Sequence, residues 1–132
     1  MSTKNARLTI IKLLLKSVVS SAGAKFITAD VNIFYLNTPM DEPEYTKIPV
    51  RLIPDEIKVE YKVGEFEHAG YMYLQINKGM YGLAQAGLLA NELLAKILAK
   101  HGFNQRPHTP GLWRHHTKPI QFALVVDDFC IK

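Results

Sequence analysis

Residues 122–131 constrain the fold more than any other part of the sequence. Two apolar stretches are separated there by only two residues, and both of these are aspartates, Asp127 and Asp128. Two strands joined by so short a loop pair as an antiparallel hairpin. The expected strands cover residues 120–126 and 129–132, with the two carboxylates side by side at the tip. The fold is therefore expected to contain an antiparallel sheet.

Apolar spacing predicts two amphipathic helices. In residues 6–20, leucine, isoleucine and valine recur three and four residues apart, and Asn5 is the expected N-cap. The positions expected to face the core of this helix are Leu8, Ile11, Leu14, Leu15, Val18 and Val19. The second helix is expected at residues 88–100, and its inward positions are Leu89, Leu93, Leu94, Ile97 and Leu98.

Shorter segments complete an α+β fold. Strands are expected at residues 25–31, 45–48, 71–76 and 112–115, and a short helix is expected to start at Pro54 and reach about residue 61. This order of elements predicts an antiparallel sheet with the helices packed on one face. A length of 132 residues corresponds to one domain.

The composition is that of an ordinary globular domain. Hydrophobic residues make up 48% and charged residues 21%, which excludes a disordered chain. The single cysteine, Cys130, excludes a disulfide scaffold, and no apolar stretch is long enough for a membrane span. The net charge of +4 favours an anionic partner without identifying one. We expect an intracellular protein that makes no membrane contact.

A third aspartate gives the hairpin a possible chemical role. Asp30 ends the strand expected at residues 25–31 and precedes Asp127 by 97 positions. If the two strands are neighbours in the sheet, three carboxylates meet, and such oxygen ligands suit Mg²⁺ or Mn²⁺. Two ions about 3.5–4 Å apart are typical of phosphoryl-transfer sites. The alternative is a plain hairpin without a metal, and the spacing alone leaves both interpretations open.

Two other segments contain unusual residues. Residues 78–87 (KGMYGLAQAG) hold three glycines, which indicates unusual backbone angles or the close approach of another group. The histidines His108, His115 and His116 are interpreted as solvated loop or nucleic-acid-facing residues rather than zinc ligands, because no second ligand cluster or cysteine pair accompanies them.

Three motifs in order resemble the central motifs of reverse transcriptases. They are DVNIFYLNTP from Asp30, KGMYGLAQAG from Lys78 and LVVDDF from Leu124. The details are similar to those of copia-type retrotransposons, including PGLW from Pro110 ahead of the hairpin. The resemblance covers essentially the whole chain. It departs from the usual Tyr-x-Asp-Asp box at Val125, where the tyrosine is missing.

The resemblance implies a palm-type sheet, part of the fingers and palm of a right-hand polymerase. It implies that Asp30, Asp127 and Asp128 are catalytic and bind two Mg²⁺ or Mn²⁺ ions, with the main-chain carbonyl of Val31 as a further ligand. One ion would lower the pKa of the primer 3′-hydroxyl and both would stabilise the transition state. Tyr35 would lie against the sugar of the incoming nucleotide and select deoxynucleotides. The remaining implied nucleotide contacts are Gln85, Gly82 and Gly87.

The implied activity is that of an RNA-directed DNA polymerase, a nucleotidyltransferase acting in retrotransposon replication. Its partners would be an RNA or DNA template with a primer, deoxynucleoside triphosphates, and the thumb, RNase H and integrase of a polyprotein. We expect residues 1–132 to form a single partial domain, a fingers remnant and palm without thumb or RNase H, and to be inactive in isolation. The alternative is a degenerate relic that acts at most as a nucleic-acid-binding or structural module.

Overall fold

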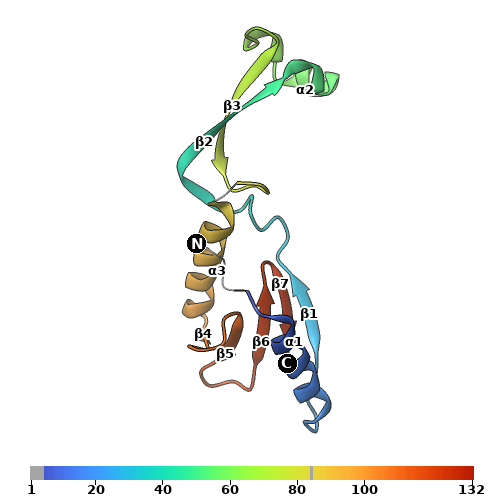
Figure 1. The fold of residues 1–132 in the computed structure, drawn as a ribbon, viewed down its shortest axis with the longest axis vertical. Helices are drawn as coiled ribbons and strands as arrows, with labels where there is room; N and C mark the ends of the chain where they lie inside the picture. The colour runs from blue at the N-terminus through green and yellow to red at the C-terminus, as the bar shows by residue number, and fades with distance from the viewer. Residues whose placement is uncertain (1–4, 84) are drawn as a thin grey trace. The chain divides into compact units, whose positions relative to one another are not determined.

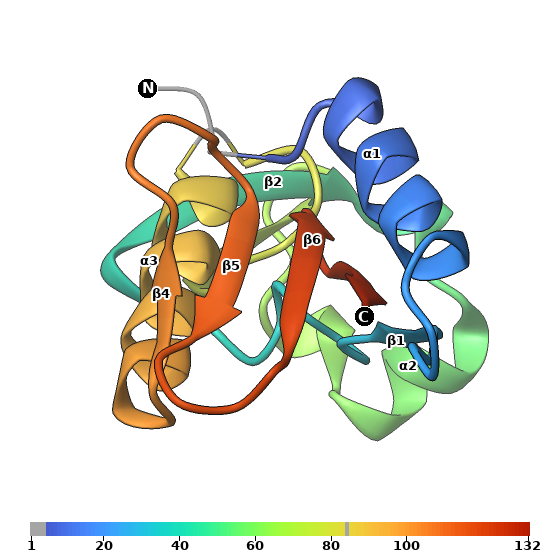
Figure 2. The same ribbon diagram turned by 90° about the horizontal axis from the view of Figure 1, so that it is seen from below.

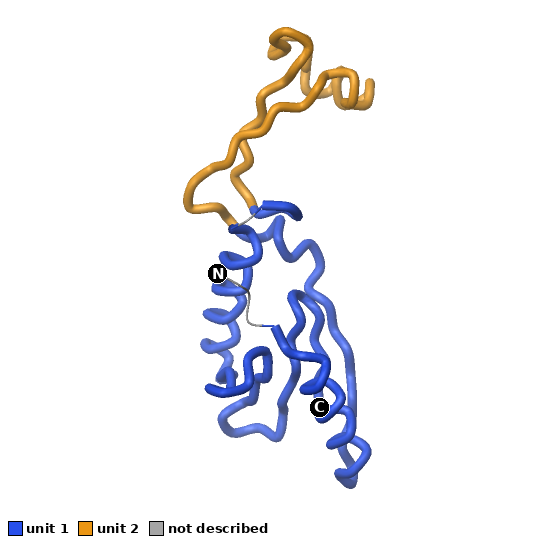
Figure 3. Tube along the Cα trace, in the orientation of Figure 1, with its two compact units in different colours: residues 1–38, 79–132 blue, residues 39–78 orange. Residues whose placement is uncertain are grey.

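The computed structural model describes residues 5–83 and 85–132, and the chain divides into two compact units (Figure 3). Unit 1 comprises residues 1–38 and 79–132, and unit 2 comprises residues 39–78. The chain leaves and re-enters unit 1 at adjacent positions, because the Gly79 N–H donates a hydrogen bond to the Thr38 carbonyl at 2.8 Å.

Unit 1 is built on a five-stranded antiparallel sheet (Figure 1). In spatial order the strands are β1 (Ile27–Asp30), β7 (Asp128–Ile131), β6 (Gln121–Val125), β5 (Leu112–His115) and β4 (Phe103–Gln105). The sequence did not predict β4, since three residues are too few to show a periodic pattern.

The predicted hairpin forms between β6 and β7, but its loop lies one residue earlier than expected. The loop residues are Val126 and Asp127, and Asp128 is the first residue of β7, paired with Val125. The predicted loop of Asp127 and Asp128 is therefore wrong. Val126 was expected in the strand because its side chain is apolar. In the structure, the pairing of Val125 with Asp128 makes Val126 the first loop residue.

The helices α1 (Leu8–Val19) and α3 (Ala86–Lys100) cover opposite faces of the sheet, on either side of β6 (Figure 2). Successive side chains of a strand point to opposite faces. Phe122 and Leu124 pack in the cluster that includes Leu94 and Leu98 of α3, whereas Ala123 packs with α1. The predicted packing of the helices on one face is thus wrong. The run of apolar residues in β6 does not alternate with polar ones, and such a strand is buried on both sides.

Only part of the predicted face of α1 is buried. Leu14 packs against the sheet, but Leu8 and Val19 are 64% and 89% exposed. The helix begins after Arg7, which makes no side-chain cap, so the prediction of Asn5 as N-cap is wrong. The Asn5 side chain instead accepts a hydrogen bond from the backbone of Val126.

The buried face of α3 is rotated from the predicted one. Ala86 and Ala90 are buried, and Leu94, Ala95 and Leu98 pack against the sheet, whereas Ile97 is 44% exposed. The small alanines were not counted as inward positions because their side chains contribute little to apolar periodicity.

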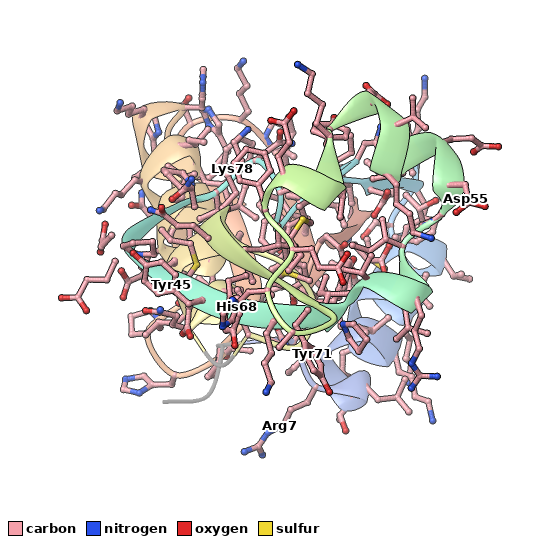
Figure 4. The ribbon with its side chains drawn as sticks, turned by 90° about the horizontal axis from the view of Figure 1, so that it is seen from above. Arg7, Tyr45, Asp55, His68, Tyr71 and Lys78 are labelled. Atoms are coloured by element: carbon pink, nitrogen blue, oxygen red, sulfur yellow. The ribbon has the colours of Figure 1, made fainter. Side chains whose placement is uncertain are left out.

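Unit 2 is a two-stranded antiparallel ribbon with short helical turns between its strands. Its elements are β2 (Pro39–Pro49), η1 (Val50–Leu52), α2 (Asp55–Glu60), η2 (Val63–Glu65) and β3 (Tyr71–Lys78). The Val63 side chain is fully buried. On α2 the Lys58 ammonium lies 2.7 Å from Asp55, whose side chain points outward (Figure 4). No helix in the part of the chain that the structure describes is long and apolar enough to span a membrane.

Candidate metal and nucleotide site

Three carboxylates from two distant parts of the sequence meet at one end of β1 and β7. Asp30 pairs directly with Asp128 in the antiparallel register, and Asp127 lies in the adjoining loop. One carboxylate oxygen of each residue lies within 4.8 Å of the other two. Asp127 is half-buried, whereas Asp30 and Asp128 are exposed. The structure thus brings together the three aspartates singled out in the sequence.

The donor chemistry of this cluster suits a hard divalent cation. Three negative charges this close repel one another unless a cation lies between them, and carboxylate oxygens are the ligands that Mg²⁺ and Mn²⁺ prefer. Among residues 5–83 and 85–132, this is the one group of three or more such side chains that could hold a metal ion. His115, one of the histidines considered above as a zinc ligand, uses its Nδ1 in hydrogen bonds instead. This atom accepts the backbone N–H groups of Thr117 and Lys118, at 3.1 and 3.0 Å.

The hairpin loop that carries Asp127 has an unusual backbone. Val126 has φ of +58°, a left-handed conformation that is strained for a β-branched residue. Its N–H donates to Asn5 Oδ1 at 3.1 Å, and the Val31 N–H donates to the Asp127 carbonyl, also at 3.1 Å. Sequence reasoning missed both Val126 and Asn5. The signal for Val126 was available, since a two-residue hairpin loop requires positive φ in at least one residue.

Tyr35 lies in the segment that follows β1. Its ring meets the ring of Tyr81 edge to face, with centroids 4.5 Å apart, and the ring of Phe34 edge to face at 5.3 Å. Burial raises the pKa of the Tyr35 phenol, and the charges of Asp127 and Tyr81 raise this pKa further. Tyr81 is a contact that the sequence did not reveal.

The glycine-rich segment runs against the segment after β1. A Cβ at Gly79 would lie 2.8 Å from the Tyr35 carbonyl oxygen, so this close approach requires glycine. Gly82 has φ of +94° and open space around it. Gln85 precedes the first residue of α3, and Gly87 lies within that helix. The Gln85 carbonyl accepts the Leu89 N–H at 3.1 Å. Gly79 thus allows the close approach of the two segments.

Comparison with known proteins decides the family. The sequence matches the family described as reverse transcriptase (RNA-dependent DNA polymerase) over residues 1–132, the whole chain. This chain belongs to the reverse transcriptase family. It is also 35% identical over 104 residues to a protein of Saccharomyces cerevisiae described as a transposon Ty5-1 protein. That match covers 77% of this chain and 30% of the yeast protein, so the chain spans about a third of this relative. No solved structure matches the chain significantly.

The predicted membership of the reverse transcriptases is therefore confirmed. In this reverse transcriptase chain, the acidic cluster joins the first and third of the motifs recognised in the sequence, at Asp30 and at Asp127 with Asp128. The second motif supplies Gly79 and Tyr81, which contact Tyr35 of the first motif. All three motifs thus converge within unit 1.

Proposed function

We propose that this chain carries the catalytic centre of an RNA-directed DNA polymerase, which adds deoxynucleotides to the 3′-hydroxyl of a primer. The observation that supports this most directly is the grouping of the Asp30, Asp127 and Asp128 carboxylates within 4.8 Å. Membership of the reverse transcriptase family gives the grouping its chemical interpretation.

In this proposal the three aspartates hold two Mg²⁺ or Mn²⁺ ions, and the Val31 carbonyl is a further ligand. When bound, the ions supply an activated 3′-hydroxyl and charge stabilisation during phosphoryl transfer. The task of the chain is to hold its carboxylates close despite their repulsion. The antiparallel register sets Asp30 opposite Asp128, and the backbone hydrogen bond from the Val31 N–H to the Asp127 carbonyl holds the two strands together beside this pair.

The nucleotide would bind beside this cluster. We assign to Tyr35 the role of a flat wall against the sugar, where a 2′-hydroxyl would clash with the ring. Its edge-to-face contact with Tyr81 favours a defined orientation of the ring, which such a steric role requires. Gln85, Gly82 and Gly87 are the proposed contacts of the nucleotide in the second motif. The open space around Gly82 leaves room for the close approach of a phosphate.

The proposed partners are a template with its primer and deoxynucleoside triphosphates. The yeast relative is longer than this chain, and its description as a transposon protein supports the proposed role in retrotransposon replication. The copia type is proposed from the sequence motifs alone. In that setting, the thumb, RNase H and integrase would come from other parts of a polyprotein.

Metal binding tests the first step of the proposal. We expect wild-type chain to bind Mn²⁺, and Asp127→Asn to weaken that binding by more than about tenfold because a ligand charge is lost. Glu92→Gln is the matched control, since Glu92 is the remaining acidic residue of unit 1 and lies on α3. Equal Mn²⁺ affinities of wild-type and Asp127→Asn chains, measured by electron paramagnetic resonance, would contradict the metal assignment.

Primer extension tests the reaction itself. The 132 residues are placed in an active enzyme of the same family, in exchange for its matching segment. We expect Mg²⁺-dependent extension on an RNA template, abolished by Asp127→Asn and retained by Glu92→Gln. Extension that persists in the Asp127→Asn chimera would refute a catalytic role for this residue.

A second candidate function is nucleic-acid binding without turnover, and the charge distribution favours it. Unit 1 holds eleven Lys and Arg residues and four Asp and Glu residues, and three of these four form the acidic cluster. Unit 2 holds five Lys and Arg residues and eight Asp and Glu residues. The exposed residues Arg106 and Arg114 line one shallow groove with Asn104 and His116 at the β4 edge of the sheet. No acidic residue lines this groove, which therefore suits a phosphate backbone.

The salt dependence of binding tests this second function. For a fluorescent RNA–DNA hybrid, we expect Arg106→Ala with Arg114→Ala to lower the slope of log K against log salt by about two, or roughly one per lost phosphate contact. Lys58→Ala with Lys62→Ala in unit 2 removes the same charge from the acidic unit and should leave the slope unchanged. Equal slopes for the two double variants would exclude the groove as the binding surface.

A further inference from the structure

The loop between β6 and β7 is held in a conformation that its own sequence disfavours. Of its two residues, Val126 is the one with positive φ, at +58°. A strained residue of this kind persists only when its surroundings fix it. Asp127 is the next residue along the chain. Whatever holds Val126 in place therefore also determines where the Asp127 carboxylate lies.

Asn5 provides a hydrogen bond that reaches this loop from outside the hairpin. Its Oδ1 accepts the Val126 N–H at 3.1 Å, from a position 121 residues away in the sequence. On the other side, the Val31 N–H donates to the Asp127 carbonyl at 3.1 Å. The loop is thus fixed at the amide of its first residue and at the carbonyl of its second.

The segment that carries Asn5 is itself anchored beside β6. The Ala6 N–H donates to the Leu124 carbonyl at 2.8 Å, and Ala6 is buried. The Leu124 N–H donates to the Gly111 carbonyl, also at 2.8 Å. A side chain at Gly111 would collide with the backbone of Asn5 and Ala6, so a glycine is required there. Backbone contacts on β6 therefore set the position of Asn5.

We propose that Asn5 is a positioning residue for Asp127. Its amide oxygen stabilises the left-handed Val126, and this conformation keeps the Asp127 carboxylate within reach of Asp30 and Asp128. Asn5 contacts neither metal nor nucleotide and acts only through the loop backbone. The functional part of this inference rests on the metal site proposed above.

Amide hydrogen exchange, followed by NMR on the complete chain, tests the hydrogen bond directly. We expect Asn5→Val to reduce the protection of the Val126 amide by about fivefold, the effect of losing one ordinary hydrogen bond. The Leu124 amide, which bonds to Gly111, serves as an internal reference and should keep its protection. Asn5→Asp retains an acceptor oxygen and should restore the protection of Val126. The same change on α3, Asn91→Val, should leave Val126 unaffected.

Mn²⁺ affinity tests the consequence for the metal site. We expect Asn5→Val to weaken Mn²⁺ binding by about tenfold, while Asn91→Val binds as the wild type does. Should Asn5→Val fail to fold, Asn5→Ser replaces it, because the shorter hydroxyl does not reach Val126.

The outcomes separate the two proposals. Unchanged Val126 exchange, or lost protection without any change in Mn²⁺ affinity, overturns the positioning role and leaves the metal site standing. A wild-type chain that binds no Mn²⁺ overturns the metal site and, with it, the functional part of this inference.

Discussion

At the scale of single residues, His115 gives the protein a pH-dependent stability. Burial lowers the pKa of His115, the neighbouring His116 and Lys118 lower it further, and a hydrogen bond with the His101 backbone opposes them. The neutral ring accepts two backbone N–H groups at Nδ1, packs edge to face on Phe103 and stacks on His116. Protonation of Nδ1 removes both accepted bonds.

The sign of the pH effect follows from the lowered pKa. The stabilisation by His115 is fully present above the unfolded pKa of about 6.5 and is lost as pH falls through the lower folded pKa. We expect the melting temperature of the wild type to fall more steeply between about pH 8 and pH 5 than that of His115→Gln, which does not titrate. Parallel curves for the two proteins would contradict this role of His115.

The candidate site shows what single residues reveal before the structure is known. The three aspartates could be singled out because two adjacent carboxylates separate two apolar stretches and a third follows another apolar strand. Asn5 could not, because a neutral amide near a helix start is typical of a cap, and its contact with Val126 spans 121 residues. Interactions that depend on the fold alone leave no local pattern in the sequence.

At the scale of elements, the end of α3 depends on a glycine. Gly102 has φ of +82°, and an added Cβ would overlap the His116 ring and lie 3.0 Å from His115 Nε2. The His116 ring would have to leave its 2.8 Å contact with the Gly102 carbonyl. We expect Gly102→Ala to lower the free energy of unfolding by about 2–4 kcal/mol, as a sum of backbone strain and overpacking.

Gly23 is the matched control for this substitution. It has φ of +72°, but no atom lies within 4 Å of the position that an added Cβ would take. Gly23→Ala therefore carries the backbone cost alone, about 1 kcal/mol. Urea unfolding measures both variants. Equal decreases in the free energy of unfolding for the two variants would show that the His115 and His116 rings move aside without destabilising the fold.

Elements were predicted better than their packing. Both long helices and every described strand except β4 were expected, since apolar periodicity is a local property. Which face of a helix is buried depends on its neighbours. The apolar residues of β6 pack against α1 on one face of the sheet and against α3 on the other. In α3, the small residues Ala86 and Ala90 are buried.

At the scale of the whole molecule, the division into two units predicts that unit 1 folds without unit 2. Both core clusters and all three aspartates belong to unit 1, and the Thr38 carbonyl bonds to the Gly79 N–H at 2.8 Å. We expect a chain in which a two-residue Asn-Gly turn replaces residues 39–78 to bind Mn²⁺ within about twofold of the wild type.

Circular dichroism and Mn²⁺ titration check this expectation. Replacement of residues 40–77 by the same turn provides a control in which Pro39 and Lys78, the first pair of the ribbon, are retained. Loss of sheet structure in both shortened chains would show that unit 1 requires unit 2 to fold.

The direct pairing of Asp30 with Asp128 has a consequence for the stability of the folded protein. Like charges set opposite each other across two strands weaken the sheet at that point. An ion bound between them reverses the sign of this contribution, and the gain grows with the logarithm of its concentration. Divalent-cation supply would then govern how long the folded molecule escapes proteolysis, even when no template is present.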